Sequence, residues 1–187
     1  NIPGALVVIL MTLVVIRGTK GSAIVNAIIV FLKVGVVVVF IALGWQYIDP
    51  ANYKPYIPTN TGKFGEFGWS GVLRAAGLVF FVFIGFDAVS TQAGEAINPR
   101  KDVPFAIVAS LIICTVLYIL VSLVLTGMVK YDTLDLKAPV ASAFSGVGLT
   151  WATILITVAA TAGLMSVMLV MMLGQTRIFL GMAKDGL

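Results

Sequence analysis

The stretch that decides the fold is FFVFIGFDAVSTQAGEAINPRKDVP, which runs from Phe80 to Pro104. It begins as an apolar strip of the kind that lies in lipid, and then introduces Gly85, Asp87 and Glu95 within a few residues. A carboxylate inside a membrane span is costly and normally faces a cavity or a partner. Asp87 therefore predicts a functional site within this span.

The composition of the whole chain is that of a membrane protein. Its 187 residues are 60% hydrophobic and 11% charged, whereas ordinary soluble domains are about 25% charged. Apolar windows of about 20 residues recur along the chain, and each is long enough to cross roughly 30 Å of hydrocarbon as a helix. We predict an all-α polytopic membrane protein, and we expect it to be an internal part of a longer transporter-like chain.

About five transmembrane helices are expected. The apolar segments are Ile2 to Ile16, Ser22 to Ile48, Trp69 to about Glu95, Pro104 to Val129, and about Leu149 to Thr176. The connections hold the glycines, prolines and charges typical of loops, as in residues 49–68, 98–102 and 130–148.

Basic residues predict the orientation of these spans. Six of them fall on one side of the expected zigzag, namely Arg17, Lys20, Arg100, Lys101, Arg177 and Lys184. Lysine and arginine collect in cytoplasmic loops, so this side is predicted to be cytoplasmic. The expected location is the plasma membrane, most simply a bacterial inner membrane.

Several function classes find no support in the sequence. The net charge of +4 is not gathered into a basic stripe with aromatic residues, so no nucleic-acid partner is expected. The chain has one cysteine, Cys114, and no histidine, which argues against a metal site, a cofactor and histidine-based catalysis. An enzyme is therefore not expected.

The residues around Asp87 predict a broken helix. Gly85 precedes it and polar residues follow, and non-helical backbone at this depth persists only where it lines a cavity. The carbonyls of Phe81, Val82 and Ile84 would then be able to accept hydrogen bonds from an ammonium group, while Asp87 supplies a titratable charge. The alternative is that Asp87 caps the half-helix that follows, and both roles are compatible.

Lys33 is the second charged residue inside an apolar span, surrounded by residues such as Leu32 and Val34. A long side chain can snorkel toward the interface. The alternative is an interior ammonium that carries a proton or takes the place of a bound cation.

The last span combines small residues with methionines. Residues 159–163 and Ser166 favour close helix packing, with a cation site as the less favoured reading. Methionines at helical spacing, Met171 among them, are usually adaptable core, of which one or two would contact a ligand.

The motif FVFIGFDAVSTQAGEAINPRKDVP and the final RIFLGMAKDGL resemble the amino acid-polyamine-organocation transporter superfamily, in particular its cationic amino acid transporter branch and the bacterial relatives of that branch. The resemblance implies a LeuT-like fold of two inverted five-helix repeats, with substrate held at unwound parts of the first and sixth helices. It assigns residues 1–48 to transmembrane helices 4 and 5, residues 49–68 to an extracellular linker, and residues 69–187 to helices 6 to 8.

The resemblance also implies roles for single residues. The carbonyls of Phe81, Val82 and Ile84 would receive the substrate α-amino group beside Gly85, and Asp87 matches an acidic position at the site. Lys33 resembles a fifth-helix lysine of some bacterial relatives, whose ammonium occupies the place of a sodium ion and suggests proton coupling. Met171 stands where eukaryotic relatives usually carry a small polar residue, which would narrow the pocket and disfavour arginine-sized substrates.

The main hypothesis is therefore a proton-coupled symporter of small neutral or cationic L-amino acids that works by alternating access. Its expected partners are the amino acid, protons and membrane lipid, and the sequence names no accessory subunit. An amino acid or amine exchanger, and a non-transporting membrane scaffold or sensor with the same fold, are the alternatives.

Overall fold

The computed structural model describes residues 2–16, 19–83, 85, 89–90, 93, 96–135, 137–184 and 186. Its main helices are α1 (Ile2–Ile16), α2 (Thr19–Gly44), α3 (Gly68–Phe80), α5 (Pro99–Met128), α6 (Pro139–Gly146) and α7 (Thr150–Lys184). Three short 3₁₀ segments accompany them: η1 (Trp45–Tyr47), η2 (Pro50–Tyr53) and η3 (Phe81–Phe83). The described residues are thus helical or irregular, which confirms the all-α prediction.

Three helical stretches are long and apolar enough to cross a membrane, namely Ile24–Tyr47, Pro99–Met128 and Thr150–Lys184. Two shorter apolar helices, Gly4–Ile16 and Gly68–Phe83, accompany them. Most of the large apolar side chains remain exposed, as on Phe31, which keeps 84% of its surface. Such surfaces suit lipid or further protein, and the chain is a membrane-embedded, multi-pass protein.

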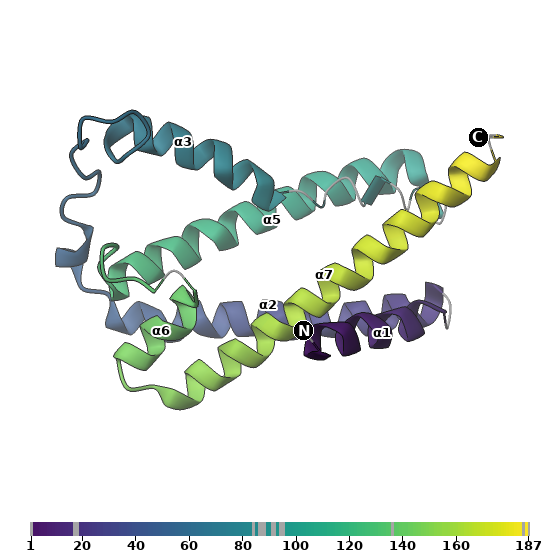
Figure 1. Cartoon of the computed structure of the whole chain (residues 1–187), viewed down its shortest axis with the longest axis horizontal. Helices are drawn as coiled ribbons and strands as arrows, with labels where there is room; N and C mark the ends of the chain where they lie inside the picture. The colour runs from purple at the N-terminus through teal and green to yellow at the C-terminus, as the bar shows by residue number, and fades with distance from the viewer. Residues whose placement is uncertain are drawn as a thin grey trace.

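The long helices alternate in direction (Figure 1). The connections formed by residues 45–67 and 129–149 lie at one end of the molecule, which we call the linker end. The start of α2, the start of α5 and the end of α7 lie toward the opposite end. The predicted zigzag is therefore present. Of the basic residues predicted to share one side, Lys20, Arg100, Lys101, Arg177 and Lys184 belong to segments at that opposite end, and Arg17 lies outside the described residues.

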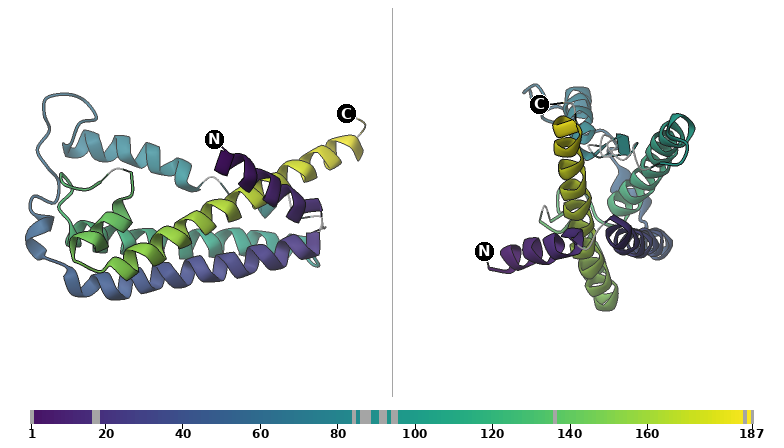
Figure 2. Two further views of the ribbon diagram at one scale, coloured as in Figure 1. Left: turned by 60° about the horizontal axis from the view of Figure 1, so that its bottom comes forward. Right: turned by 90° about the vertical axis from the view of Figure 1, so that its right-hand side faces the viewer.

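α7 is the helix that packs against several of the others. It runs at a marked angle to α2 in the left view of Figure 2 and packs against α1, α2 and α6. α5 runs beside α2, whereas α3 diverges from α5 (Figure 1). A buried cluster holds α2, α5, α6 and α7 together near the linker end, with the rings of Phe40 and Phe144 packed edge to face at 5.3 Å.

The linker is fastened to the last turns of α5. The backbone N–H of Asp49 and the side-chain amide of Asn52 donate to the carbonyl of Gly127 at 3.0 and 2.7 Å. The Tyr53 hydroxyl donates to the carbonyl of Leu123 at 2.7 Å. Gly127 is among the last four residues of α5, whose carbonyls lack partners within the helix, so the two bonds to its carbonyl satisfy a group that lipid could not.

Some predicted boundaries were wrong, and α5 shows why. Residues 98–102 were expected to form a connection, but α5 begins at Pro99 and contains most of them. Proline is well suited to the first helical position because it has no N–H to leave unpaired. The carboxylate of Asp102 also accepts a hydrogen bond from the backbone N–H of Asn98 at 3.2 Å.

The other predicted boundaries differ from the structure because helices begin and end at residues that apolar composition alone does not indicate. Residues 130–148, predicted as a loop, contain the short helix α6, whose Ala143 and Phe144 are buried in the cluster. α7 continues past Thr176 to Lys184. The α-helix of the second span runs from Thr19 to Gly44 rather than from Ser22 to Ile48.

Candidate functional site

The third apolar segment does not remain an α-helix. α3 ends at Phe80, the N–H of Phe81 bonds to the carbonyls of Leu78 and Val79, and the chain tightens into the 3₁₀ turn η3. Gly85 then takes φ 150°, a conformation that favours glycine. The predicted interruption of the helix near Gly85 is confirmed for the described residues. Ile84 and Asp87 lie outside them, as does Glu95.

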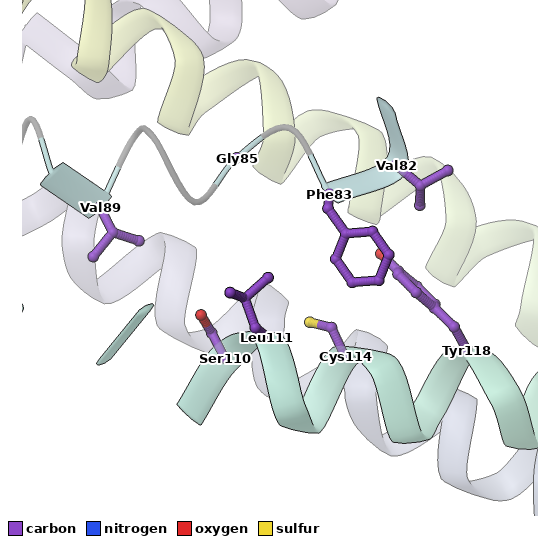
Figure 3. A pocket seen from close by; sticks show the side chains of 8 residues that line it. All are labelled: Val82, Phe83, Gly85, Val89, Ser110, Leu111, Cys114 and Tyr118. Atoms are coloured by element: carbon purple, nitrogen blue, oxygen red, sulfur yellow. The ribbon is translucent and has the colours of Figure 1, made fainter. Parts of the chain in front are cut away.

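A cavity of about 250 Å³ lies between this interruption and α5, and we call it the break cavity. Figure 3 shows its side chains, which come from the interrupted segment and from one face of α5. They belong to Val82, Phe83, Gly85, Val89, Ser110, Leu111, Cys114 and Tyr118. The structure thus brings Val82 and Gly85 to one cavity, whereas the side chain of Phe81 is 65% exposed and does not line it.

The contribution of α5 was missed in the sequence. Ser110, Cys114 and Tyr118 are spaced by four residues, so they share one face of the helix. In an otherwise apolar helix, this row of polar and aromatic side chains at helical spacing is the signal that identifies the face. The sequence could not reveal that α3 and η3 lie opposite to it.

Lys33 lies in a second cavity of about 440 Å³, the lysine cavity, between α2, α5 and α7. The close approach of α7 is made at Gly163, where a Cβ would lie 3.8 Å from Cδ of Lys33. Among the described residues that line this cavity, Lys33 is the only charged one. Its stem therefore packs against α7, as both readings of Lys33 allow, and its role in coupling stays a prediction.

The two cavities share part of their wall. Cys114 and Tyr118 line both, so a single face of α5 separates the interrupted helix from Lys33. Met171 does not line either cavity and is 44% exposed on α7, eight residues beyond Gly163. Its contact with a substrate stays a prediction.

A polar contact links α2 to α7 at the interface that also contains Lys33. The Ser166 hydroxyl, only 2% exposed, donates to the side-chain oxygen of Asn26 at 2.6 Å. Of the small residues expected to pack closely, Ala159 and Ser166 are buried along α7, whereas Ala160 and Thr161 are exposed. Asn26 was missed because its partner is 140 residues away in the sequence.

No group of three metal-ligating side chains occurs within the part of the chain that the structure describes. Two ion pairs are found there, Lys63 with Glu66 at 3.7 Å and Lys130 with Asp132 at 3.5 Å. All four residues lie in connections at the linker end, away from both cavities.

Comparison with known proteins shows to which family this chain belongs. The family described as amino acid permease matches residues 2–187. The chain belongs to the amino acid permease family. This confirms the resemblance drawn from the Gly-Phe-Asp motif, and it points to a membrane transporter rather than an enzyme.

Individual relatives of this permease chain differ in what their names say they carry. It is 41% identical over 187 residues to a methylthioribose transporter and 42% identical over 188 residues to a branched-chain amino acid permease, both from Bacillus subtilis. It is also 42% identical to cationic amino acid transporter 9 of Arabidopsis thaliana. Each match covers all of this chain but only 39%, 39% and 32% of the relative, so the chain spans about two-fifths of their length or less.

Proposed function

We propose that the protein to which this chain belongs is a secondary transporter of small neutral or cationic L-amino acids in the plasma membrane. The observation that carries the proposal is the end of α3 at Phe80, followed by Gly85 at φ 150° beside the break cavity. Non-helical backbone at membrane depth persists where it lines a cavity. In transporters, such interruptions hold the substrate with backbone groups.

The proposed architecture is a LeuT-like inverted repeat working by alternating access. Residues 1–48 would close the first repeat, residues 49–68 would form the extracellular linker, and residues 69–187 would open the second repeat. The carbonyls of Phe81, Val82 and Ile84 would accept hydrogen bonds from the substrate amine. Asp87 would supply a negative charge next to them.

Lys33 is the proposed coupling residue, together with Asp87. The lysine cavity offers its ammonium no acidic partner among the described residues that line it. Charged side chains inside membrane spans often mark ion or substrate pathways, and this supports the proposal that Lys33 takes part in coupling. The proposed mechanism is therefore symport with protons.

The substrate class is proposed from the family and from two relatives named for amino acids. Met171 would narrow the pocket against arginine-sized substrates. The methylthioribose transporter among the relatives supports a second candidate, a small non-peptidic solute of that kind.

Uptake into proteoliposomes tests the proposal with the full protein. Radiolabelled leucine, alanine, lysine, arginine and methylthioribose are supplied with and without an imposed pH gradient, acidic outside. Amino acid uptake is expected to rise severalfold with the gradient. Uptake that depends only on amino acid inside the vesicles would instead identify an exchanger, and absence of uptake of every solute would overturn transport.

Lys33→Met tests the coupling role. The variant is expected to bind substrate, seen as a thermal shift, while its uptake no longer responds to the pH gradient. Lys137→Met, at an exposed lysine near the linker end, serves as the matched control and should keep the response. A full pH response in Lys33→Met would contradict the role of Lys33.

A further inference from the structure

Three cavities meet at one tyrosine. Tyr118 lines the break cavity, the lysine cavity and a third cavity of about 860 Å³ between α3, α5 and the linker, which we call the linker cavity. Phe83, the last residue of η3, lines the break and linker cavities. The two rings pack edge to face, with centroids 5.4 Å apart and an interplanar angle of 74°. Figure 3 shows them turned toward one another.

The Phe83–Tyr118 ring pair lies where the linker cavity meets the break cavity. The linker cavity extends from Tyr56 and Trp69 near the linker end to Phe83, and the break cavity extends from Phe83 to Val89 and Ser110. Phe83 and Tyr118 are the residues, among those described, that line both of these cavities. Displacing either ring would join the two spaces.

The segment that carries Phe83 depends on this contact for its position. A 3₁₀ turn is held by poorer hydrogen-bond geometry than an α-helix, and Gly85 follows η3 with a backbone conformation that few residues adopt. Among the described residues, η3 makes two ring contacts: Phe81 packs against the neighbouring Phe80 of α3, and Phe83 packs against Tyr118, which joins η3 to α5. The hydroxyl of Tyr118 makes no hydrogen bond to any described residue, so the ring itself is the part that matters.

We infer that the Phe83–Tyr118 ring pair is the partition that closes the break cavity toward the linker end. Tyr118 is then a positioning residue for η3, and its effect on transport rests on the proposed function. An edge-to-face ring contact of this kind biases an opening equilibrium by roughly three- to tenfold.

The rate at which Cys114 is chemically labelled can report whether this partition is open or closed. It is the single cysteine of the chain and precedes Tyr118 by one helical turn. It lines the break and lysine cavities but not the linker cavity. A reagent that enters through the linker cavity therefore meets the ring pair before it reaches the thiol through the break cavity.

The experiment measures how fast a membrane-impermeant maleimide modifies Cys114 in the full protein, with the modified peptide quantified by mass spectrometry. The reagent is applied to right-side-out and to inverted vesicles, and a Lys130→Cys variant identifies the side that carries the linker end. Tyr118→Ala is expected to accelerate labelling roughly three- to tenfold from that side only. Tyr118→Phe keeps the ring and should label at the unmodified rate.

Tyr131→Ala is the matched control. Tyr131 lines the linker cavity and makes its own edge-to-face contact with Phe67 at 6.0 Å, but it does not line the break cavity. Its removal should leave Cys114 labelling unchanged. Phe83→Leu removes the other ring while keeping an apolar side chain, and it should reproduce the acceleration if Tyr118→Ala does not fold.

Equal labelling in Tyr118→Ala, Phe83→Leu and the unmodified protein would overturn the partition, as would acceleration from both sides. This readout does not need transport, so it can succeed even if the uptake experiment fails. Where uptake is measurable, Tyr118→Ala is expected to raise KM while Tyr118→Phe restores it. An unchanged KM in Tyr118→Ala would contradict the positioning role of Tyr118 but not the proposed partition.

Discussion

At the scale of single residues, close approach between segments depends on positions without a side chain. Gly44 and Gly127 are buried, and each faces side chains from another element. A Cβ at residue 127 would overlap the Tyr53 hydroxyl and would lie 3.0 Å from Cγ2 of Ile48. This glycine lets the linker pack on α5 and lets Tyr53 reach the carbonyl of Leu123.

Gly127→Ala is therefore expected to destabilise the protein. Overpacking of this kind typically costs roughly 1–3 kcal/mol, and displacement of Tyr53 adds the loss of its hydrogen bond. Thermal unfolding in detergent checks the result. Gly146→Ala is the control, because residue 146 has open space around it, and its effect should stay below about 1 kcal/mol.

The Asn26–Ser166 hydrogen bond is a second prediction at this scale. Hydrogen bonds between transmembrane helices average about 0.6 kcal/mol and reach about 1.7 kcal/mol in double-mutant cycles. We expect Asn26→Ala and Ser166→Ala to show a coupling energy within that range, measured by unfolding of the two single variants and the double variant. Strictly additive effects would mean that the 2.6 Å contact contributes nothing to the packing of α2 on α7.

At the scale of elements, the ends of helices decide where a site can form. α3 stops at Phe80 although apolar residues continue, and α5 starts at Pro99 inside a polar stretch. The first end leaves backbone without α-helical hydrogen bonds inside the apolar segment. The second end is stabilised by proline at the first position and by the carboxylate of Asp102.

Gly85 and Gly77 form a matched pair that tests the interruption. A Cβ at either position would meet nothing within 4 Å, but Gly85 has φ 150° whereas Gly77 lies inside α3. Gly85→Ala is expected to cost roughly 1–3 kcal/mol because the residue is held in a sparsely populated conformation. Gly77→Ala should instead stabilise the helix, by up to about 1 kcal/mol.

The measurement is thermal unfolding of both variants, followed by uptake in proteoliposomes. Loss of uptake in Gly85→Ala, with uptake preserved in Gly77→Ala, is the expected pattern. If Gly85→Ala were as stable and as active as Gly77→Ala, the backbone at residue 85 would not need the conformation seen in the structure.

At the scale of the whole molecule, α5 is long and apolar enough to cross a membrane, so we expect its two ends on opposite sides. Arg100 is in the first turn of α5 and Lys130 follows its last turn. The basic residues predict that the end with Arg100 is cytoplasmic.

Cysteine labelling checks this topology in a Cys114→Ala background. An impermeant maleimide should label Lys130→Cys in intact cells and should label Arg100→Cys only after the membrane is permeabilised. The reverse pattern would invert the proposed orientation but keep the zigzag. Labelling of both from outside would contradict a membrane-spanning α5.

Local features of the sequence were sufficient to predict the class of protein, the approximate spans and the interruption near Gly85. Each of these is encoded locally: apolar length sets the span, and a glycine with polar neighbours breaks the helix. The same local information was insufficient for α6, because the burial of Ala143 and Phe144 comes from helices elsewhere in the chain. It was also insufficient for the end of α7, since a helix can continue beyond its apolar stretch.

Which residues face one another became known from the packing of the helices in three dimensions. It placed Ser110, Cys114 and Tyr118 opposite the interrupted helix, brought Gly163 against Lys33, and paired Asn26 with Ser166. The sequence marks a polar row on α5, but it contains no pattern that says which segment packs against that row. Contacts between distant helices depend on how the helices cross, and the crossing is fixed by packing rather than by local sequence.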